Sequence, residues 1–237
     1  ATISAAERDA AAQGAADALC AYIRTPSPPE QEAENPRNTG ENPPEKERSF
    51  SHGEGPLNEG AEGTLRQHIL EAIHQRVRWR LNPEEQVGEY ETPLQAQTTP
   101  GPWSHLVFDF SGAEFRHTVN LSESYWGAGA NFSGCSYRET ANLSASVYAA
   151  AARFTASTYY GKAIFRNSVY RAAVHMSGCN YRGQVHAQAS VYEAEANLSE
   201  NTYRECADWT RSTWRGHLNA SGCTYRRAAN FAECTWG

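Results

Sequence analysis

The sequence predicts an all-β fold, a stacked β-solenoid, over residues 107–237, with two helices before it. Three observations predict this fold. An aromatic residue recurs at every eleventh position from Phe115 to Trp236 without a gap. A second apolar residue precedes each aromatic by five positions. Small or β-branched residues lie two positions before that second series, which is the side-chain spacing of a strand.

Both series are predicted to form the interior of the solenoid. The aromatic series comprises Phe115, Trp126, Tyr137, Tyr148, Tyr159, Tyr170, Tyr181, Tyr192, Tyr203, Trp214, Tyr225 and Trp236. The second series comprises Phe110, Leu121, Phe132, Leu143, Phe154, Phe165, Met176, Leu198, Trp209 and Phe231, with alanine at 187 and 220. Ser or Cys lies two positions before most of the aromatics, and Asn201 is an exception. We expect these serines to bond some of the buried tyrosine hydroxyls, because a buried hydroxyl needs a partner.

A right-handed coiled coil is the helical alternative for an 11-residue period. Residues five apart on an α-helix point about 140° apart, so the two apolar series would face different sides of such a helix. The aromatic, Asn, Ser and Gly content also disfavours a helix. Short strands joined by corners and repeated at a fixed period are typical of a β-solenoid.

The repeat resembles the pentapeptide-repeat family. The unit Ala141-Asn142-Leu143-Ser144-Ala145, followed by the five residues 146–150, is similar to two pentapeptides, with one extra residue at Ala151. The resemblance implies a right-handed quadrilateral β-helix. With the extra residues, it implies a coil of about 22 residues and neighbouring coils about 4.8 Å apart. The resemblance covers residues 108–237.

Two helices are predicted before the solenoid. The first spans 1–24 and begins with a capping box at Ser4 and Glu7. The second spans 63–82, carries an apolar stripe of Leu65, Ile69, Ile73 and Val77, and is expected to cap the open end of the solenoid. Its arginines leave a membrane-surface helix as the alternative.

The remaining residues before the solenoid are predicted to be linkers. Residues 25–62 hold seven Pro and nine Glu against three basic residues, which predicts a disordered acidic segment. Residues 83–106 are interpreted as a second linker.

The cysteines and the composition indicate a reducing compartment. Cys135, Cys179 and Cys223 are spaced by 44 residues, which places them two coils, about 9.6 Å, apart and beyond disulfide reach. We therefore expect buried structural thiols and a cytoplasmic location. The N-terminal part also resembles pentapeptide-repeat proteins common in actinobacteria, many of which carry transmembrane helices upstream. That resemblance implies a parent protein tethered to a membrane through a segment absent here.

One outward column is predicted from the residue that follows the aromatic in alternate units. Its members are Arg116, Arg138, Tyr160, Arg182, Arg204 and Arg226. Stacked like charges repel each other, so the column needs acids nearby, and Glu139 and Glu205 are expected to neutralise part of it. We interpret the column as a docking stripe for an acidic partner or phosphate polymer, or as a solvated corner that prevents aggregation.

The sequence favours a non-enzymatic scaffold that binds an unknown protein partner. His175 and His186 are expected on different faces, and no catalytic residues, metal ligands or cofactor are predicted. The uncapped end at Trp236 indicates either a homodimer through the C-terminal coil or a truncated chain. A nucleic-acid or polyanion rod using the arginine column is the alternative. A DNA mimic acting on a topoisomerase is disfavoured, because residues 108–237 hold 10 acidic and 12 basic residues.

Overall fold

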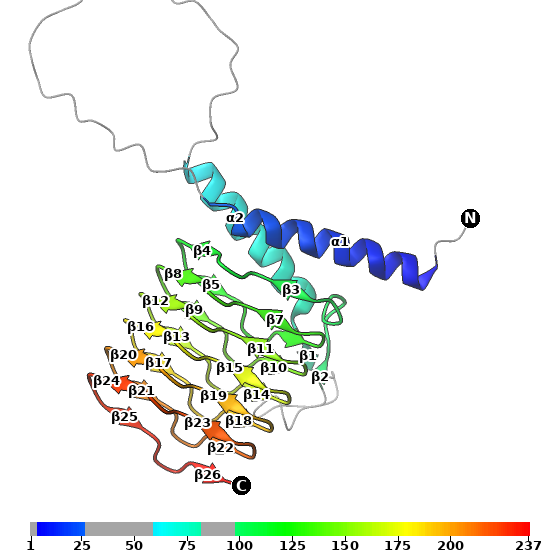
Figure 1. Ribbon diagram of the computed structural model, residues 1–237. Coiled ribbons are helices and arrows are strands. Elements are labelled where there is room, and N and C mark those ends of the chain that lie inside the picture. Colours follow the sequence, from blue (N-terminus) through cyan, green and yellow to red (C-terminus); the bar gives the residue numbers. More distant parts are fainter. Residues whose placement is uncertain (1–3, 27–58, 82–97) are drawn as a thin grey trace, which may run out of the picture.

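The computed structural model describes residues 4–26, 59–81 and 98–237, and residues 108–237 form a β-solenoid of six coils (Figure 1). Each two-residue strand pairs in parallel with strands 22 positions away, as in the register of Tyr159 with Tyr137 and Tyr181. The strands stack into four six-stranded parallel sheets, one for each side of the coil. The predicted all-β solenoid with about 22 residues per coil is therefore confirmed.

The four sheets are named here by their first strands. The β3 sheet contains β3 (Phe108–Asp109), β7 (Ala130–Asn131), β11 (Ala152–Arg153), β15 (Val174–His175), β19 (Ala196–Asn197) and β23 (Leu218–Asn219). The β4 sheet contains β4 (Glu114–Phe115), β8 (Ser136–Tyr137), β12 (Thr158–Tyr159), β16 (Asn180–Tyr181), β20 (Thr202–Tyr203) and β24 (Thr224–Tyr225). The β5 sheet contains β5 (Val119–Asn120), β9 (Ala141–Asn142), β13 (Ala163–Ile164), β17 (Val185–His186), β21 (Ala207–Asp208) and β25 (Ala229–Asn230). The β6 sheet contains β6 (Tyr125–Trp126), β10 (Val147–Tyr148), β14 (Val169–Tyr170), β18 (Val191–Tyr192), β22 (Thr213–Trp214) and β26 (Thr235–Trp236).

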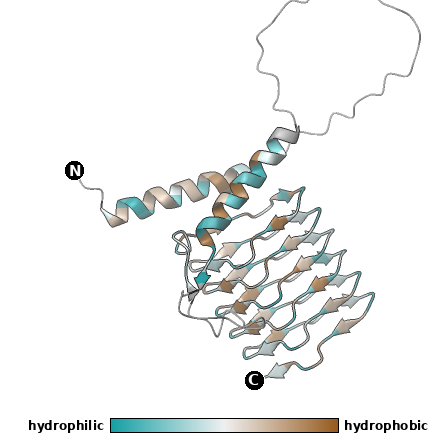
Figure 2. Cartoon of the chain, turned by 180° about the vertical axis from the view of Figure 1, so that it is seen from behind, coloured by the Kyte–Doolittle hydropathy of each residue, from teal (hydrophilic) through white to brown (hydrophobic). Residues whose placement is uncertain are grey.

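The interior is a set of stacked rings, one layer for each coil. Tyr137 and Tyr159 lie 4.7 Å apart between ring centroids with nearly parallel planes, and Tyr148 and Tyr170 lie 4.8 Å apart in the next aromatic column. Phe132 and Phe154 stack in the same way, and Phe154 meets Tyr148 edge to face. In Figure 2 the hydrophobic segments of the solenoid are mainly the strands. Both predicted apolar series therefore line the core through the first five coils.

The sixth coil differs from the others. Tyr225 and Trp236, which were predicted to be core residues, are 37% and 58% exposed, and Phe231 is only partly buried. Among the described residues, no further coil covers these rings. Trp236 still stacks on Trp214, with the centroids 6.0 Å apart.

The Ser and Cys column joins neighbouring coils through the backbone. The Ser157 hydroxyl donates to the Phe132 carbonyl (2.8 Å) and accepts from the Cys135 amide (3.1 Å). The Cys135 thiol likewise lies 3.1 Å from the Phe110 carbonyl, and burial raises its pKa to about 12. All six cysteines are free and all lie in described residues.

The prediction that these serines bond the tyrosine hydroxyls is wrong. Within the described residues, the hydroxyls of Tyr137, Tyr148, Tyr159 and Tyr170 are buried without a hydrogen-bond partner, because the serines are used by the backbone. At Asn201, where the column departs from Ser and Cys, the side-chain amide donates to the Tyr203 hydroxyl at 3.0 Å.

One corner of every repeat has a left-handed backbone. The residue three positions before each aromatic has a positive φ, and four of these twelve residues are glycines. The others include Ala145, Ala156 and Ala189, with φ between 51° and 57°. A Cβ in this region costs roughly 1–2 kcal/mol, so the parallel ladder of the neighbouring strands holds these corners in place.

Two helices pack on the first coil (Figure 1). Helix α1 (Ala5–Arg24) starts with the predicted capping box, in which Ser4 accepts from the Glu7 amide and Glu7 from the Ser4 amide. Helix α1 contacts β3, and helix α2 (Glu59–Val77) contacts α1 and β5. Both helices therefore lie at the end of the solenoid that the sequence predicted to be capped.

The buried face of α2 includes Ile73 and Val77 of the predicted stripe but differs from it at the other two positions. Leu65 is 42% exposed and Ile69 only partly buried, whereas the buried residues of α2 are Arg66, Leu70, Ile73, His74 and Val77. Polar side chains thus occupy two positions of the contact face. The helix also ends at Val77 instead of continuing to residue 82, and the chain then forms β1 (Arg80–Leu81), which pairs with β2 (Thr98–Thr99) in antiparallel register.

Most of the two predicted linkers lies outside the described residues. The described parts differ from the prediction, because residues 59–62 belong to α2, and residues 98–106 include β2 and the buried Ser104 and Leu106.

Candidate functional site

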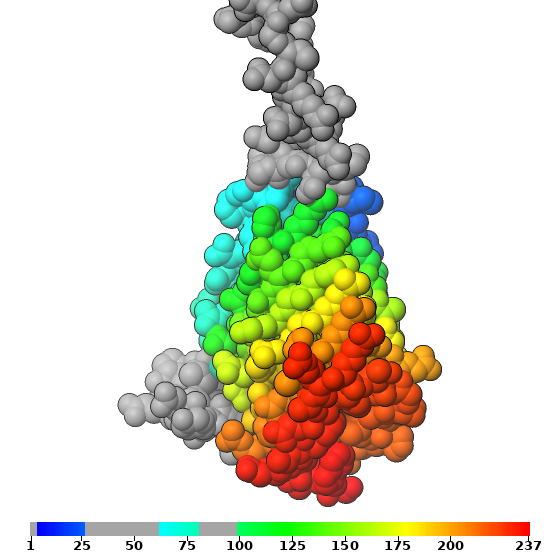
Figure 3. All heavy atoms as spheres, turned by 90° about the vertical axis from the view of Figure 1, so that its left-hand side faces the viewer, coloured from blue at the N-terminus to red at the C-terminus, as the bar shows by residue number. Residues whose placement is uncertain are grey.

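The structure brings the six residues of the arginine column (Arg116, Arg138, Tyr160, Arg182, Arg204 and Arg226) into one line. Each follows a strand of the β4 sheet, so neighbouring members lie in neighbouring coils. The ladder sets this alignment: the Arg138 amide donates to the Phe115 carbonyl, and the Tyr160 amide donates to the Tyr137 carbonyl, both at 2.9 Å. The strands of the β4 sheet are on the left of Figure 1, the side that faces the viewer in Figure 3.

Tyr160 separates the charges at the middle of the column. The Arg138 guanidinium carbon lies 4.7 Å from the centroid of the Tyr160 ring, and that of Arg182 lies 4.5 Å from it. Each cation–π contact contributes about 0.5–1 kcal/mol at an exposed site. Because the ring is placed between two cations, it replaces like-charge repulsion with two attractive contacts.

The prediction that Glu139 and Glu205 neutralise the column is wrong. The Glu139 carboxylate accepts from the amide and hydroxyl of Thr118, at 2.9 and 2.8 Å, and Glu205 lies 3.9 Å from Arg227. Glu114 carries this role at the N-terminal end instead, since it accepts from Arg138 at 3.0 Å.

The C-terminal half of the column remains available to a partner. Arg204 is exposed, as is Arg226, and neither side chain has an ion pair with the described part of the chain. The Arg182 guanidinium contacts the ring of Tyr160 and likewise has no ion pair there. The column thus offers guanidinium N–H donors, which match carboxylate and phosphate oxygens.

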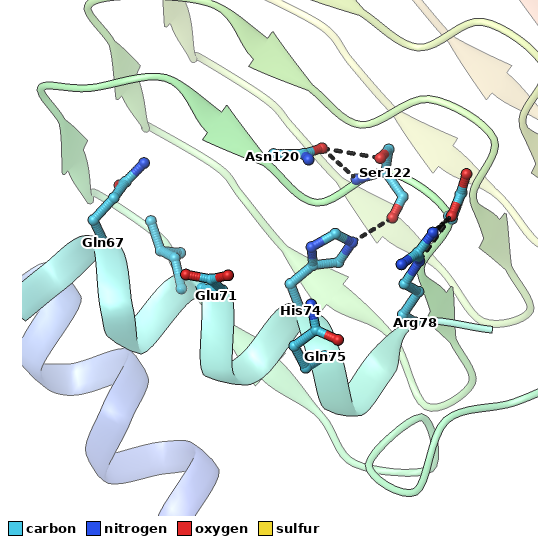
Figure 4. Close-up of a pocket in the computed structure, with 9 residues that line it drawn as sticks. Gln67, Glu71, His74, Gln75, Arg78, Asn120 and Ser122 are labelled. Carbon is cyan, nitrogen blue, oxygen red and sulfur yellow. Dashed lines mark hydrogen bonds and ion pairs between the residues drawn. The ribbon is translucent and has the colours of Figure 1, made fainter. Parts of the chain in front are cut away.

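A second candidate is the cleft of about 500 Å³ between α2 and β5 (Figure 4). His74 points from α2 toward the solenoid, and its Nε2–H donates to the Ser122 carbonyl at 2.6 Å. Burial lowers the pKa of His74, and the charge of Arg78 acts in the same direction. Arg78 itself pairs with Glu123.

The polar groups of this cleft mainly hold α2 in place. Gln67 donates to the Thr118 carbonyl at 2.6 Å, and outside the cleft the Trp79 Nε1–H donates to the Ala145 carbonyl at 2.8 Å. The Nε2 atom of His74 is bonded to the Ser122 carbonyl, and the Ser122 hydroxyl is bonded to Asn120. We therefore interpret the cleft as the joint between α2 and the solenoid.

Two histidines of the repeat lie on different sides of the coil, as the sequence predicted. His175 is in β15 of the β3 sheet and His186 is in β17 of the β5 sheet, so the two rings are on different sides of the coil. In the described ranges, no group of three or more His, Cys, Asp or Glu side chains is arranged to hold a metal ion. Neither described helix combines the length and apolar character needed to cross a bilayer.

Comparisons with known proteins gave no match among family models, curated proteins or solved structures.

Sequence reasoning missed two features of this site. Glu114 lies one position before the first aromatic, in the outward position of β4, and that position could have marked it as the acid beside the column. The second feature is a stretch of 53 residues, 140–192, that contains no Asp or Glu.

Proposed function

We propose that this chain is a non-enzymatic scaffold that binds a protein partner along the arginine column. We also propose that the chain belongs to the pentapeptide-repeat family, as a variant with an 11-residue repeat unit. We propose a bacterial source and a cytoplasmic location. The observation that carries the binding proposal is the exposed line Arg182, Arg204 and Arg226, which begins at the Arg138–Tyr160–Arg182 sandwich.

The sandwich favours a purpose beyond solubility. A corner that only prevents aggregation needs charge, but it does not need that charge to be fixed in direction. Here the Tyr160 ring contacts the guanidinium groups of Arg138 and Arg182, and the N–H groups of Arg182, which has no ion pair with the described residues, are left for an acceptor. A preordered donor array loses less side-chain entropy when a partner binds.

A polyanion or nucleic acid is the second candidate, supported by the net positive charge of residues 108–237. Single-stranded nucleic acid is usually bound on aromatic platforms. Both faces of Tyr160, the one aromatic residue in the column, are covered by arginines, so the column has no ring on which a base can stack. A DNA mimic needs dense negative charge, which residues 108–237 lack.

Position-specific photo-crosslinking tests the scaffold proposal. A photoreactive residue replaces Arg204 in one variant and Asn219, in the β3 sheet, in a matched control, and each is exposed to a bacterial lysate with and without nuclease. We expect a protein adduct of discrete mass at position 204, resistant to nuclease and lost when Arg182→Glu is added. An adduct that nuclease removes, or one equally strong at position 219, would contradict the proposal.

A homodimer through the sixth coil is a separate proposal, supported by the exposed rings of Tyr225 and Trp236. Light scattering across concentration tests it. We expect Trp236→Lys to shift the dimer toward monomer, and a wild-type chain that stays monomeric at high concentration would exclude the dimer.

A further inference from the structure

Positive charge is concentrated in the middle coils of the solenoid. Residues 140–192 hold five Lys or Arg and two His without an acidic residue. This stretch runs from just before β9 (Ala141–Asn142) to the end of β18 (Val191–Tyr192). Three of its cations, Lys162, Arg166 and Arg182, lie on the β5 sheet and on the arginine column that precedes it along each coil.

Two of these cations flank β13 (Ala163–Ile164) of the β5 sheet. Lys162 follows Tyr160 by two residues, with Gly161 between them, and Arg166 follows Ile164 by two. Lys162, Ile164 and Arg166 alternate with the buried Ala163 and Phe165, so these three side chains share the outward face of this strand. His186 pairs in register with Ile164 in the adjacent strand.

Ile164 is an apolar exception in this column of outward residues. Its position in the β5 sheet is occupied by Asn, His or Asp in the other coils: Asn120, Asn142, His186, Asp208 and Asn230. The Asn142 side-chain amide donates to the Asn120 side chain at 3.2 Å, so polar residues at this position can hydrogen-bond between neighbouring coils. Ile164 is partly exposed and does not belong to the core, which leaves it without an interior role.

The acids that border this corner already have partners. Glu139 accepts from Thr118 at two atoms. Asp208 accepts from the Thr210 amide and from Gln188, both at 2.9 Å. The cations around Ile164 are therefore not neutralised by either carboxylate.

We propose that the basic–apolar patch formed by Lys162, Ile164, Arg166 and Arg182 binds an acidic peptide segment that carries an apolar residue among its carboxylates. This inference rests on the scaffold proposed above and names the chemistry of its partner. The apolar residue contacts Ile164, and the flanking carboxylates accept from the surrounding Arg and Lys groups. Because arginines cover both faces of the Tyr160 ring, a nucleic-acid base cannot stack on it, and we expect the ligand to bind through carboxylates.

Fluorescence anisotropy with short labelled peptides tests the proposal on the full chain. The probes are a glutamate peptide with one central leucine, the same peptide with a central serine, and a lysine peptide, with single-stranded thymidine DNA as the nucleic-acid arm. We expect the leucine peptide to bind about tenfold more tightly than the serine peptide, which corresponds to burial of about one aliphatic side chain. We expect both acidic peptides to weaken as salt rises and the lysine peptide not to bind.

Three variants locate the site. Ile164→Asn restores the residue found at Asn120 and Asn142, so the variant is expected to fold, and it should remove the preference for leucine over serine. Lys162→Gln with Arg166→Gln should weaken the binding of both acidic peptides about tenfold, as expected when two solvent-exposed ion pairs are lost. Arg153→Gln, in the same coil but on the β3 sheet, is the matched control and should change neither peptide. Circular dichroism and melting curves check that each variant folds.

The outcomes separate this inference from the scaffold proposal. If a protein adduct forms at position 204 but neither acidic peptide binds, the scaffold stands and the acidic partner is excluded. A leucine preference that survives Ile164→Asn, or an equal loss in the Arg153→Gln control, would overturn the patch. Thymidine DNA that binds more tightly than either acidic peptide would replace the peptide with nucleic acid.

Discussion

Coils within the solenoid are joined by contacts that recur every 22 residues, whereas α1 and α2 are joined to the first coil by contacts that occur once. Between coils, the parallel ladder, stacked rings and Ser or Cys bridges repeat with the register. At the helical end, Arg66 donates to the carbonyls of Ile23 and Thr25, and Gln67 and His74 each donate to one carbonyl of the first coil. A repeat period in the sequence therefore predicts the contacts that recur between coils, but it does not predict the contacts that occur once, between the helices and the first coil.

Removing a repeated core ring should have the largest effect. Phe154 is fully buried, stacks on Phe132 and meets Tyr148 and Phe165 by their edges. Phe154→Ala should lower the free energy of unfolding of the solenoid by about 3–5 kcal/mol, because the rigid coils above and below cannot close the cavity. Urea denaturation followed by circular dichroism measures the change. A loss below about 1 kcal/mol would mean that the coils relax more than close packing allows.

Removing Arg66 should release α1 and leave the solenoid intact. The Arg66 guanidinium donates to the carbonyls of Ile23 (2.8 Å) and Thr25 (2.6 Å) at the end of α1, and pairs with Glu62 at 2.8 Å. Arg66→Ala should weaken the docking of α1 by about 3 kcal/mol, since Glu62 and the helix carbonyls lose a buried partner. Hydrogen exchange should accelerate in α1 and stay unchanged in β12–β16.

Leu65→Ala is the control for that experiment. Leu65 belonged to the predicted apolar stripe but is exposed, so its removal should change stability by less than about 0.5 kcal/mol. A larger loss would restore the predicted stripe as the contact face.

A pair of tyrosines sharpens the comparison inside the solenoid. The Tyr159 hydroxyl is buried without a hydrogen-bond partner in the described structure, whereas the Tyr203 hydroxyl accepts from Asn201. Tyr159→Phe should leave stability unchanged or raise it, while Tyr203→Phe should lower it by about 1 kcal/mol. Thermal unfolding of both variants measures the difference, and equal effects would show that the Asn201 bond contributes nothing.

Acid should loosen the helical end before it affects the ladder. Burial holds the pKa of His74 below its ordinary value of 6.5, so the folded chain binds fewer protons there than the unfolded chain. This contribution to stability is present above pH 6.5 and is lost as the pH falls through the ordinary value toward the lowered one. Exchange of α2 amides should therefore quicken on acidification, and His74→Gln should remove that dependence. Exchange in α2 that stays constant between neutral and mildly acidic pH would contradict the assignment.

The solenoid was predictable because a single register determines it. Once the aromatic series fixes the 11-residue unit, the alignment of Arg116 through Arg226 follows from the coil length. The buried face of α2 was not predictable from hydrophobicity, because Arg66 and His74 are buried through bonds to backbone carbonyls that only the folded structure brings near. The partner of Arg138 was missed for a similar reason, since Glu114 is 24 residues away and meets it only across neighbouring coils.

Uniform coils would present the same outline at every step, so a partner could slide along them and bind equally well at several offsets. The coil that contains Tyr160 ends that equivalence, because the same turn of chain also carries Lys162, Ile164 and Arg166. A ligand that reads these residues has one position of best fit and one direction. If the coil of residues 152–173 were excised, the ladder would close again in register, but Arg138 would then lie next to Arg182. The residues that define one binding position would be lost with that coil.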